Sequence, residues 1–452
     1  MLRCPHRLFA QIVLLSLGAA CSSARAVDLV ESWQAARAND AALMASQAAL
    51  RAAEEKIAQG DALTASHVDL TANAGQAGQD YRPGLTTSSH PGAYTSGQSY
   101  GTSVVWSKPL YDASANFARE RLHREAEQAR IQYQQIEQDL MLRVARGYFD
   151  VLVARENVAL ADTQAQAIGE QLALARQSYA LGLSTASDTD DAQARHDSVV
   201  AAQIANQNDL TNKSDAFAVL TGVNSQQLAP ILSGFSASEL PPATLAAWLD
   251  QTRRSNPTVR QLELGVEIAE LSSDQYSWRG APVITAVASV GRQYEAGSIS
   301  TSGGRDAVTA GTIGLRLTVP LVDGGTRQSL LRQSMAIQDQ QRYALEAGLR
   351  EAQRATRQFF ASLRDGALRI RALERARVSG ESSVRSSKVG QEVGVRTIID
   401  VLNAEQNYYQ TLYNLTSARS DYLYARLQLA ASAGALDDTV LAQVNAALGP
   451  AK

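Results

Sequence analysis

The sequence predicts a mainly α-helical protein in which each chain also contributes four β-strands to a membrane β-barrel shared between several chains. Three observations support this prediction. The chain repeats itself internally, its longest segments have the seven-residue periodicity of coiled coils, and four segments alternate between apolar and polar residues. With 452 residues, 45% of them hydrophobic, the chain is long enough for two domain-sized units and too apolar to be disordered.

The N-terminal segment predicts export from the cytoplasm. Arg3 and Arg7 precede an apolar run from Leu8 to Ala20, and Ala24-Arg25-Ala26 has the small residues of a signal-peptidase site. Residues 1–26 are therefore interpreted as a signal peptide, with Val27 as the first residue of the mature chain.

Cys21 leaves a second interpretation open, a lipid attached to the mature N-terminus, although Gly18-Ala19-Ala20 fit a lipidation motif poorly. The other cysteine is Cys4, so cleavage after Ala26 removes both thiols and excludes disulfides and thiolate metal sites. Beyond this segment no apolar run approaches the roughly 18 residues that a transmembrane helix needs, so membrane insertion must use β-strands. A net charge of -3 provides no basic surface for nucleic acid, which is excluded as a partner.

The chain repeats itself at a separation of about 211 residues. Pro109-Leu110-Tyr111-Asp112 recurs as Pro320-Leu321-Val322-Asp323, and after one inserted residue the offset becomes 212. We therefore expect two structural repeats, at residues 27–222 and 244–436, joined by a linker at 223–243 and followed by a tail at 437–452. The matches at the second offset are Gly182, Thr185, Asp188, Ala192, Asp209 and Gly222 with Gly394, Thr397, Asp400, Ala404, Asp421 and Gly434.

Each repeat is expected to contain a helix of moderate length, two strands separated by a polar loop, a very long helix and a return helix. The moderate helices are expected at about Val27 to Gln59 and Thr244 to Ser277, and the first long helix at about Ser114 to Ala180. A helix of that length spans on the order of 100 Å, which favours an elongated barrel of coiled coils. A soluble coiled-coil bundle is the alternative, but it leaves the alternating segments unused. The coiled-coil positions follow one another at steps of three and four: Leu140, Val144, Gly147, Val151, Ala154, Val158, Ala161, Ala165, Ile168, Leu172, Ala175 and Tyr179.

Alternating apolar and polar residues predict the four strands. The clearest segments begin at Val68 and at Thr312, and less regular ones lie near Tyr100 to Trp106 and Val283 to Val290. In the Thr312 segment we expect Ile313, Leu315, Leu317 and Val319 to face lipid. Polar loops are expected at Gln76 to Gln98 and at Gly291 to Asp306. Four strands cannot close a barrel and open edges are not tolerated in lipid, so three chains would supply twelve strands.

The most specific stretch runs from Val393 to Asn403 and continues through Ala404-Glu405-Gln406-Asn407; Tyr422 to Leu436 and Asn256-Pro257 add to it. With these segments, nearly all of the mature chain resembles the TolC family of outer-membrane efflux and type I secretion proteins. The resemblance implies a homotrimer with a twelve-stranded barrel in the outer membrane and a periplasmic α-helical barrel closed at its far end. It also implies a periplasmic adaptor and an inner-membrane ABC or RND transporter as partners.

The resemblance further implies a gate at the closed end. Arg396 matches the family's gate arginine, and Ser187 and Asp188 match its neighbours on the other hairpin. Gln391 stands where some members have a tyrosine that hydrogen-bonds to the aspartate. Asp400 matches the outer member of a carboxylate pair that forms a ring at the constriction. Asn403 replaces the second carboxylate, which puts a double acidic ring in doubt.

The same residues also have a local explanation. Thr185 to Asp188 and Thr397 to Asp400 have the spacing of a capping box, in which a threonine and an acidic residue satisfy the first amides of a helix. Gly182 and Gly394 precede these boxes and are expected to permit the hairpin turns. Spacing alone favours capping, the resemblance favours a gate for Arg396 and Asp400, and one residue can serve both.

No pattern predicts catalysis, a bound cofactor or a metal site. The histidines show no ligand spacing, and there is no nucleophile elbow, P-loop or zinc signature. The leading hypothesis is therefore passive export of proteins or small molecules, driven by an inner-membrane partner. A periplasmic coiled-coil adaptor is the alternative of a different class. The histidines are His6, His67, His90, His123 and His196, of which His123 and His196 are expected on helices, solvated or at an interface.

Overall fold

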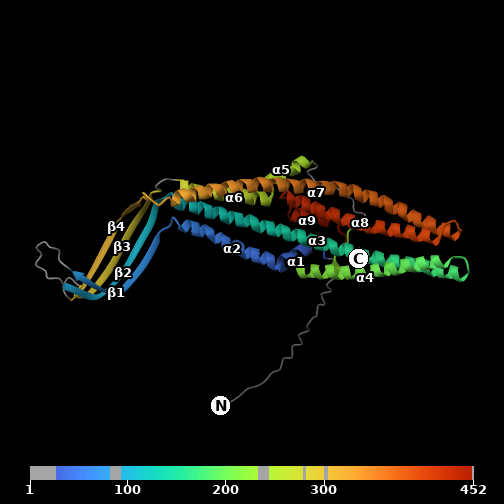
Figure 1. Cartoon of the computed structure of the whole chain (residues 1–452), viewed down its shortest axis with the longest axis horizontal. Helices are drawn as coiled ribbons and strands as arrows, with labels where there is room; N and C mark the ends of the chain where they lie inside the picture. The colour runs from blue at the N-terminus through green and yellow to red at the C-terminus, as the bar shows by residue number, and fades with distance from the viewer. Residues whose placement is uncertain (1–26, 82–92, 233–243, 278–280, 300–303, 450–452) are drawn as a thin grey trace, which may run out of the picture.

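The computed structural model describes residues 27–81, 93–232, 244–277, 281–299 and 304–449. The predicted signal peptide and the question of lipid attachment at Cys21 lie outside the described residues. The molecule is elongated, with a sheet at one end and helices running away from it toward two hairpin tips (Figure 1). Within the described part of the chain, no helix is both long and apolar enough to cross a bilayer.

The moderate helix that we expected in each repeat is in fact two helices. In the first repeat α1 (Leu29–Asn39) ends at Asp40, whose carboxylate accepts a hydrogen bond from the Leu43 amide at 2.7 Å and so begins α2 (Ala41–Ala62). In the second repeat α5 (Leu245–Ser255) and α6 (Pro257–Ser277) are separated at Asn256, because a residue before proline disfavours helical backbone. The prediction of one continuous helix was wrong in both repeats.

The first long helix has the length expected from the sequence, and its counterpart in the second repeat is nearly the same length. α3 (Ala113–Ala180) has 68 residues and returns through α4 (Ala186–Thr221), whereas α7 (Thr326–Glu392) has 67 and returns through α8 (Ile398–Ser432). At about 1.5 Å per residue the two long helices each extend on the order of 100 Å. Figure 1 shows both hairpins ending on the side of the molecule opposite the sheet.

The four strands form one antiparallel sheet in the order β1-β2-β3-β4. The strands are β1 (His67–Tyr81), β2 (Ala93–Asp112), β3 (Val283–Gly297) and β4 (Arg305–Thr318), all longer than the sequence predicted. Most residues assigned to polar loops, at 76–98 and 291–306, therefore belong to strands, and that prediction was wrong. The pairing of β2 with β3 joins the two repeats in a single sheet.

The strand register separates an apolar face from a polar one. Leu70, Val104 and Val290 lie side by side on β1, β2 and β3, and Ile313, Leu315 and Leu317 continue this surface on β4. We call it the outward face. Ile313 and Leu315 are 88% and 72% exposed there, although both are large and apolar. The opposite face is polar and includes hydrogen bonds between Thr71 and Ser103 and between Ser289 and Thr312, both at 2.7 Å.

The main core lies partway along the helices and includes segments that we expected to be linker and tail. Leu228 and Ala229, from the predicted linker, are buried, and α9 (Asp438–Asn445) packs into the core through Leu441 and Val444. The indole of Trp33 donates to the carboxylate of Asp438 at 3.1 Å, which ties α1 to α9. The described residues around 228 and in α9 are therefore part of the folded unit rather than loose connections.

Tyr148 provides a test of this core. Its side chain is fully buried, and its hydroxyl donates to the carbonyl oxygen of Ala229 at 2.8 Å. Tyr148→Phe keeps the ring but leaves this carbonyl without its donor, so we expect the free energy of unfolding to fall by about 1–3 kcal/mol. Denaturant unfolding checks this, with Tyr343→Phe at a 72% exposed position as the control. Equal losses in the two variants would contradict the assignment.

Candidate gating site at the hairpin tips

Both hairpin tips have the same backbone design. Gly182 and Gly394 have φ values of 72° and 76°, in the left-handed region that favours glycine. A Cβ added at either position would contact no atom within 4 Å, so the backbone conformation and not crowding requires glycine there. Backbone hydrogen bonds close each turn on the end of the long helix, for example from the Leu183 amide to the Ser178 carbonyl and from the Val395 amide to the Gly390 carbonyl, both at 2.8 Å. The expectation that these glycines permit the turns is consistent with this geometry.

Each return helix begins with a capping box. The Thr185 hydroxyl accepts from the Asp188 amide at 3.2 Å, and the Asp188 carboxylate accepts from the Thr185 amide at 3.0 Å. Thr397 and Asp400 repeat this arrangement at 3.2 and 2.8 Å. The capping interpretation of both pairs is therefore observed, and a gate role for either aspartate remains a prediction.

Capping sets the protonation of both aspartates. The hydrogen bond from the Thr185 backbone amide lowers the pKa of Asp188 below its usual 3.8. The Thr397 backbone amide has the same effect on the pKa of Asp400, with smaller contributions from the Thr397 hydroxyl and the Arg396 charge. Hydrogen bonds to a carboxylate favour its charged form, so both aspartates are anionic at neutral pH.

Arg396 lies against its own hairpin. Its guanidinium donates to the buried Ser387 hydroxyl at 3.3 Å, and its side chain lies over Gly390, where a Cβ would be 2.8 Å from the arginine Cγ. Within the described residues of one chain, no hydrogen bond or ion pair joins Arg396 to Ser187 or Asp188. The Gln391 backbone carbonyl accepts from Gly394 in the turn. A link from Arg396 to Ser187 or Asp188 in the assembled channel therefore stays a prediction.

The structure adds two polar contacts that sequence reasoning missed. Arg195 on α4 donates to the side-chain oxygen of Asn403 on α8 at 3.0 Å, which joins the hairpins of the two repeats. Lys388 on α7 lies 2.8 Å from Glu405 on α8, whose side chain is only 2% exposed. Each contact depends on how two different helices pack, across the repeats for Arg195–Asn403 and within the second hairpin for Lys388–Glu405, so no local sequence pattern signals it.

A polar groove lies beside the Arg195–Asn403 contact, between α3, α4 and α8. It has a volume of about 490 Å³. Its lining is uncharged apart from Arg195, so it offers neither a nucleophile with a base nor a set of metal ligands. The polar residues that line it include Asn157, Gln164, Ser198, Asn206, Gln406, Gln410 and Asn414.

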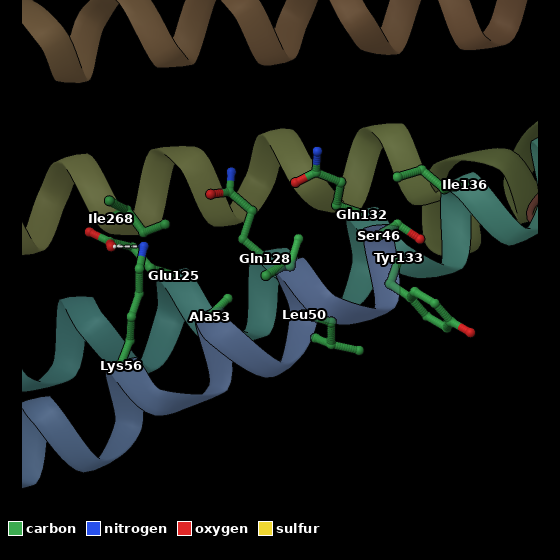
Figure 2. A pocket seen from close by; sticks show the side chains of 12 residues that line it. Ser46, Leu50, Ala53, Lys56, Glu125, Gln128, Gln132, Tyr133, Ile136 and Ile268 are labelled. Carbon is green, nitrogen blue, oxygen red and sulfur yellow. Dashed lines mark hydrogen bonds and ion pairs between the residues drawn. The ribbon is translucent and has the colours of Figure 1, made fainter. Parts of the chain in front are cut away.

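A second groove, of about 450 Å³, lies nearer the sheet, between α2, α3 and α6. Figure 2 shows its only oppositely charged pair, Lys56 and Glu125, which are 2.7 Å apart. Gln128 and Gln132 point from α3 toward α6 (Figure 2). Among the described residues no group of three or more histidine, cysteine or acidic side chains is placed to hold a metal ion. His123 lies at the α2–α3 interface, 3.1 Å from Asp61.

Comparisons with known proteins agree with this architecture. The family model described as outer membrane efflux protein matches residues 33–223 and 248–435, one match in each repeat. The chain is 29% identical to the outer membrane protein TolC of Vibrio cholerae over 448 residues, covering 99% of both chains. It is 30% identical to the alkaline protease secretion protein AprF of Pseudomonas aeruginosa over 353 residues, covering 77% of this chain and 72% of AprF.

Solved structures give the same fold. The outer membrane protein VceC of Vibrio cholerae superposes with a TM-score of 0.75 at 18% identity, covering 90% of this chain and 96% of VceC. The CmeC outer membrane channel of Campylobacter jejuni also superposes with a TM-score of 0.75, at 13% identity, covering 93% of this chain and 90% of CmeC. Together with the two matches to the family model, these results identify the chain as a member of the outer membrane efflux protein family, a transport protein of the outer membrane and not an enzyme.

Proposed function

We propose that three copies of the chain assemble into one conduit, with a twelve-stranded barrel in the outer membrane and a helical tunnel below it. The supporting observation is the sheet itself. Within the described chain, β1 and β4 each pair on one side only, and the outward face is apolar. Unpaired strand edges are not tolerated in lipid, so the edges of each sheet must pair with neighbouring copies.

Two substitutions on β4 test this arrangement. Leu315→Arg places a charge on the outward face and should cost about 2–4 kcal/mol if it lies near the middle of the bilayer. Thr312→Arg, on the opposite face, should be tolerated because that face lines water. Cross-linking of outer-membrane fractions measures trimer assembly. Equal assembly of both variants would contradict the faces, and a parent protein found only as monomers would contradict the trimer.

We further propose that the hairpin tips close the far end of the tunnel. Arg396 would leave Ser387 to reach Ser187 or Asp188 of the neighbouring copy, and three copies of Asp400 would converge at the constriction. Arg195 already holds Asn403 at 3.0 Å, which supports a single acidic ring rather than two. Gln391 would contribute a neutral polar side chain where some family members have tyrosine.

The conduit would carry material delivered by an inner-membrane transporter through a periplasmic adaptor. We favour export of proteins by type I secretion with an ABC transporter. AprF and the proteases secretion protein PrtF of Dickeya chrysanthemi, which is 27% identical over 445 residues, are both named for secretion of proteases. Efflux of small molecules with an RND pump is the second candidate, because another relative, BepC of Brucella suis, is named an outer membrane efflux protein. Membership in the channel family argues against an adaptor role.

Reconstitution in a cell that lacks its own outer-membrane duct separates the two kinds of cargo. The chain would be expressed either with a type I transporter, its adaptor and a protein substrate, or with an RND pump and its adaptor. We expect substrate protein in the medium in the first case and little change in drug susceptibility in the second. Restored drug resistance without secretion would reverse the assignment.

A further inference from the structure

Arg292 is a positively charged residue in the middle of the outward face, where its neighbours on that face are uncharged. Arg292 on β3 follows Val290 by two residues, so both side chains lie on this face. It pairs in register with Thr102 on β2 and with Thr309 on β4. Because β3 has a neighbour on each side, assembly with other copies would leave Arg292 on this surface.

Arg292 is held by an aromatic neighbour rather than by a carboxylate. Its guanidinium lies over the Tyr294 ring, 5.1 Å from the centroid, and donates to the Tyr294 hydroxyl at 3.3 Å. Among the described residues, no carboxylate lies within ion-pair distance of Arg292. The nearby acids Glu295 and Asp306 pair with each other in register on the opposite face. Guanidinium has five N–H donors, so most of them remain available to a ligand.

The position of Arg292 corresponds to the edge of an apolar band. Toward the helices this face carries Val290, Ile313 and Leu315, whereas on the other side it carries Gln98 and Arg305. Tyr100 pairs with Tyr294 across β2 and β3, so two tyrosines lie at the same level. Tyrosines concentrate at the depth of lipid headgroups, where a charge is much less costly than in the hydrocarbon.

We propose that Arg292, with Tyr294 and the Thr102 and Thr309 hydroxyls beside it, binds the phosphate of an anionic lipid headgroup on the outer side of the membrane. The guanidinium fork matches two phosphate oxygens, and the Tyr294 ring supports the guanidinium from the side away from the apolar band. Arg305 on the same face supplies a second positive charge farther from the hydrocarbon. This site rests on the proposed placement of the sheet in the bilayer.

Native mass spectrometry of purified trimers tests the site. The probes are lipid A with two phosphates, phosphatidylglycerol, phosphatidylcholine and inorganic phosphate. We expect lipid A and phosphatidylglycerol to be retained, and Arg292→Gln to weaken their binding roughly tenfold or more, since hydrogen bonds to charged groups are the strong ones. The matched control is Arg316→Gln, which removes the same side chain from the opposite face of β4, where it pairs with Thr285.

Three results would overturn the proposal. They are unchanged lipid retention by Arg292→Gln, an equal loss in Arg316→Gln, and binding of inorganic phosphate as tight as that of the lipids, which would indicate a free-anion site. Assembly is recorded in the same spectra. A parent protein that forms no trimer contradicts the proposed function, whereas an intact Arg292→Gln trimer that keeps its lipid contradicts only the lipid site.

Discussion

Replacing Arg396 by alanine is expected to open the proposed gate and to raise the conductance of purified trimers in a planar bilayer several-fold. The only side-chain hydrogen bond described for Arg396 within its chain goes to Ser387, at 3.3 Å. It therefore has donors free to hold the hairpin of a neighbouring copy. Alanine removes these donors and leaves the turn at Gly394 and the Thr397 cap in place, because neither uses the guanidinium.

The size of the effect follows from symmetry. An exposed polar link contributes about 1 kcal/mol, so three equivalent links contribute about 3 kcal/mol to the closed state. At about 1.4 kcal/mol per factor of ten, their loss shifts the ratio of open to closed tips roughly a hundredfold. That shift is large enough to appear as a change in the resting conductance rather than only in rare openings.

Arg385→Ala is the control for this experiment. Arg385 lies near the same end of α7 and is largely exposed, and its only ion pair among the described residues is with Glu381 on its own helix, at 3.5 Å. It should conduct like the parent. If Arg396→Ala also conducts like the parent, or if Arg385→Ala opens the tip as much, Arg396 does not hold a gate.

The helices and caps could be predicted from sequence because their causes are local. Small and apolar residues at intervals of three and four in α3 mark the side of that helix that is buried. Thr397 and Asp400 form a capping box in which both hydrogen bonds lie within four consecutive residues. The strands were underestimated for a related reason. Beyond Ala74 on β1 the alternation fades, but backbone hydrogen bonds continue through Gln76 with Gln98 to Tyr81. Pairing needs no apolar side chains once the neighbouring strand is in place.

Contacts between distant segments were beyond sequence reasoning. Burial of Leu228 and Ala229 depends on α3 and on the N-terminal residues, since Tyr148 donates to Ala229 and Val27 bridges to Leu228. The candidate site shows the same limit. The sequence indicated Asn403 only as a missing carboxylate, whereas its role in one chain is to accept a hydrogen bond from Arg195, 208 residues away.

The two capping boxes allow the proposed acidic ring to be tested apart from helix capping. Asp188 and Asp400 make the same hydrogen bonds, but only Asp400 is proposed to meet its copies at the constriction. Asp188→Asn and Asp400→Asn therefore remove the same local charge, and each keeps a side-chain oxygen that can accept from the threonine amide. Any difference between their conductances must come from the surroundings of the two tips.

We expect Asp400→Asn to reduce cation selectivity and block by multivalent cations while the tip stays closed. We expect Asp188→Asn to change neither, because its side-chain oxygen can still accept a hydrogen bond from Arg396 of the neighbouring copy. The pH dependence of the parent follows from two opposing effects. Capping lowers the pKa of Asp400 below 3.8, so the stability that the cap contributes is present above about pH 4 and is lost as the pH falls through the lower folded value. Three converging carboxylates raise the pKa instead, because like charges favour protonation. Cation selectivity that falls well above pH 4 in the parent, and that is lower and independent of pH over this range in Asp400→Asn, would place the ring at the constriction. Identical selectivity in both variants and the parent would leave Asp400 as a helix cap alone.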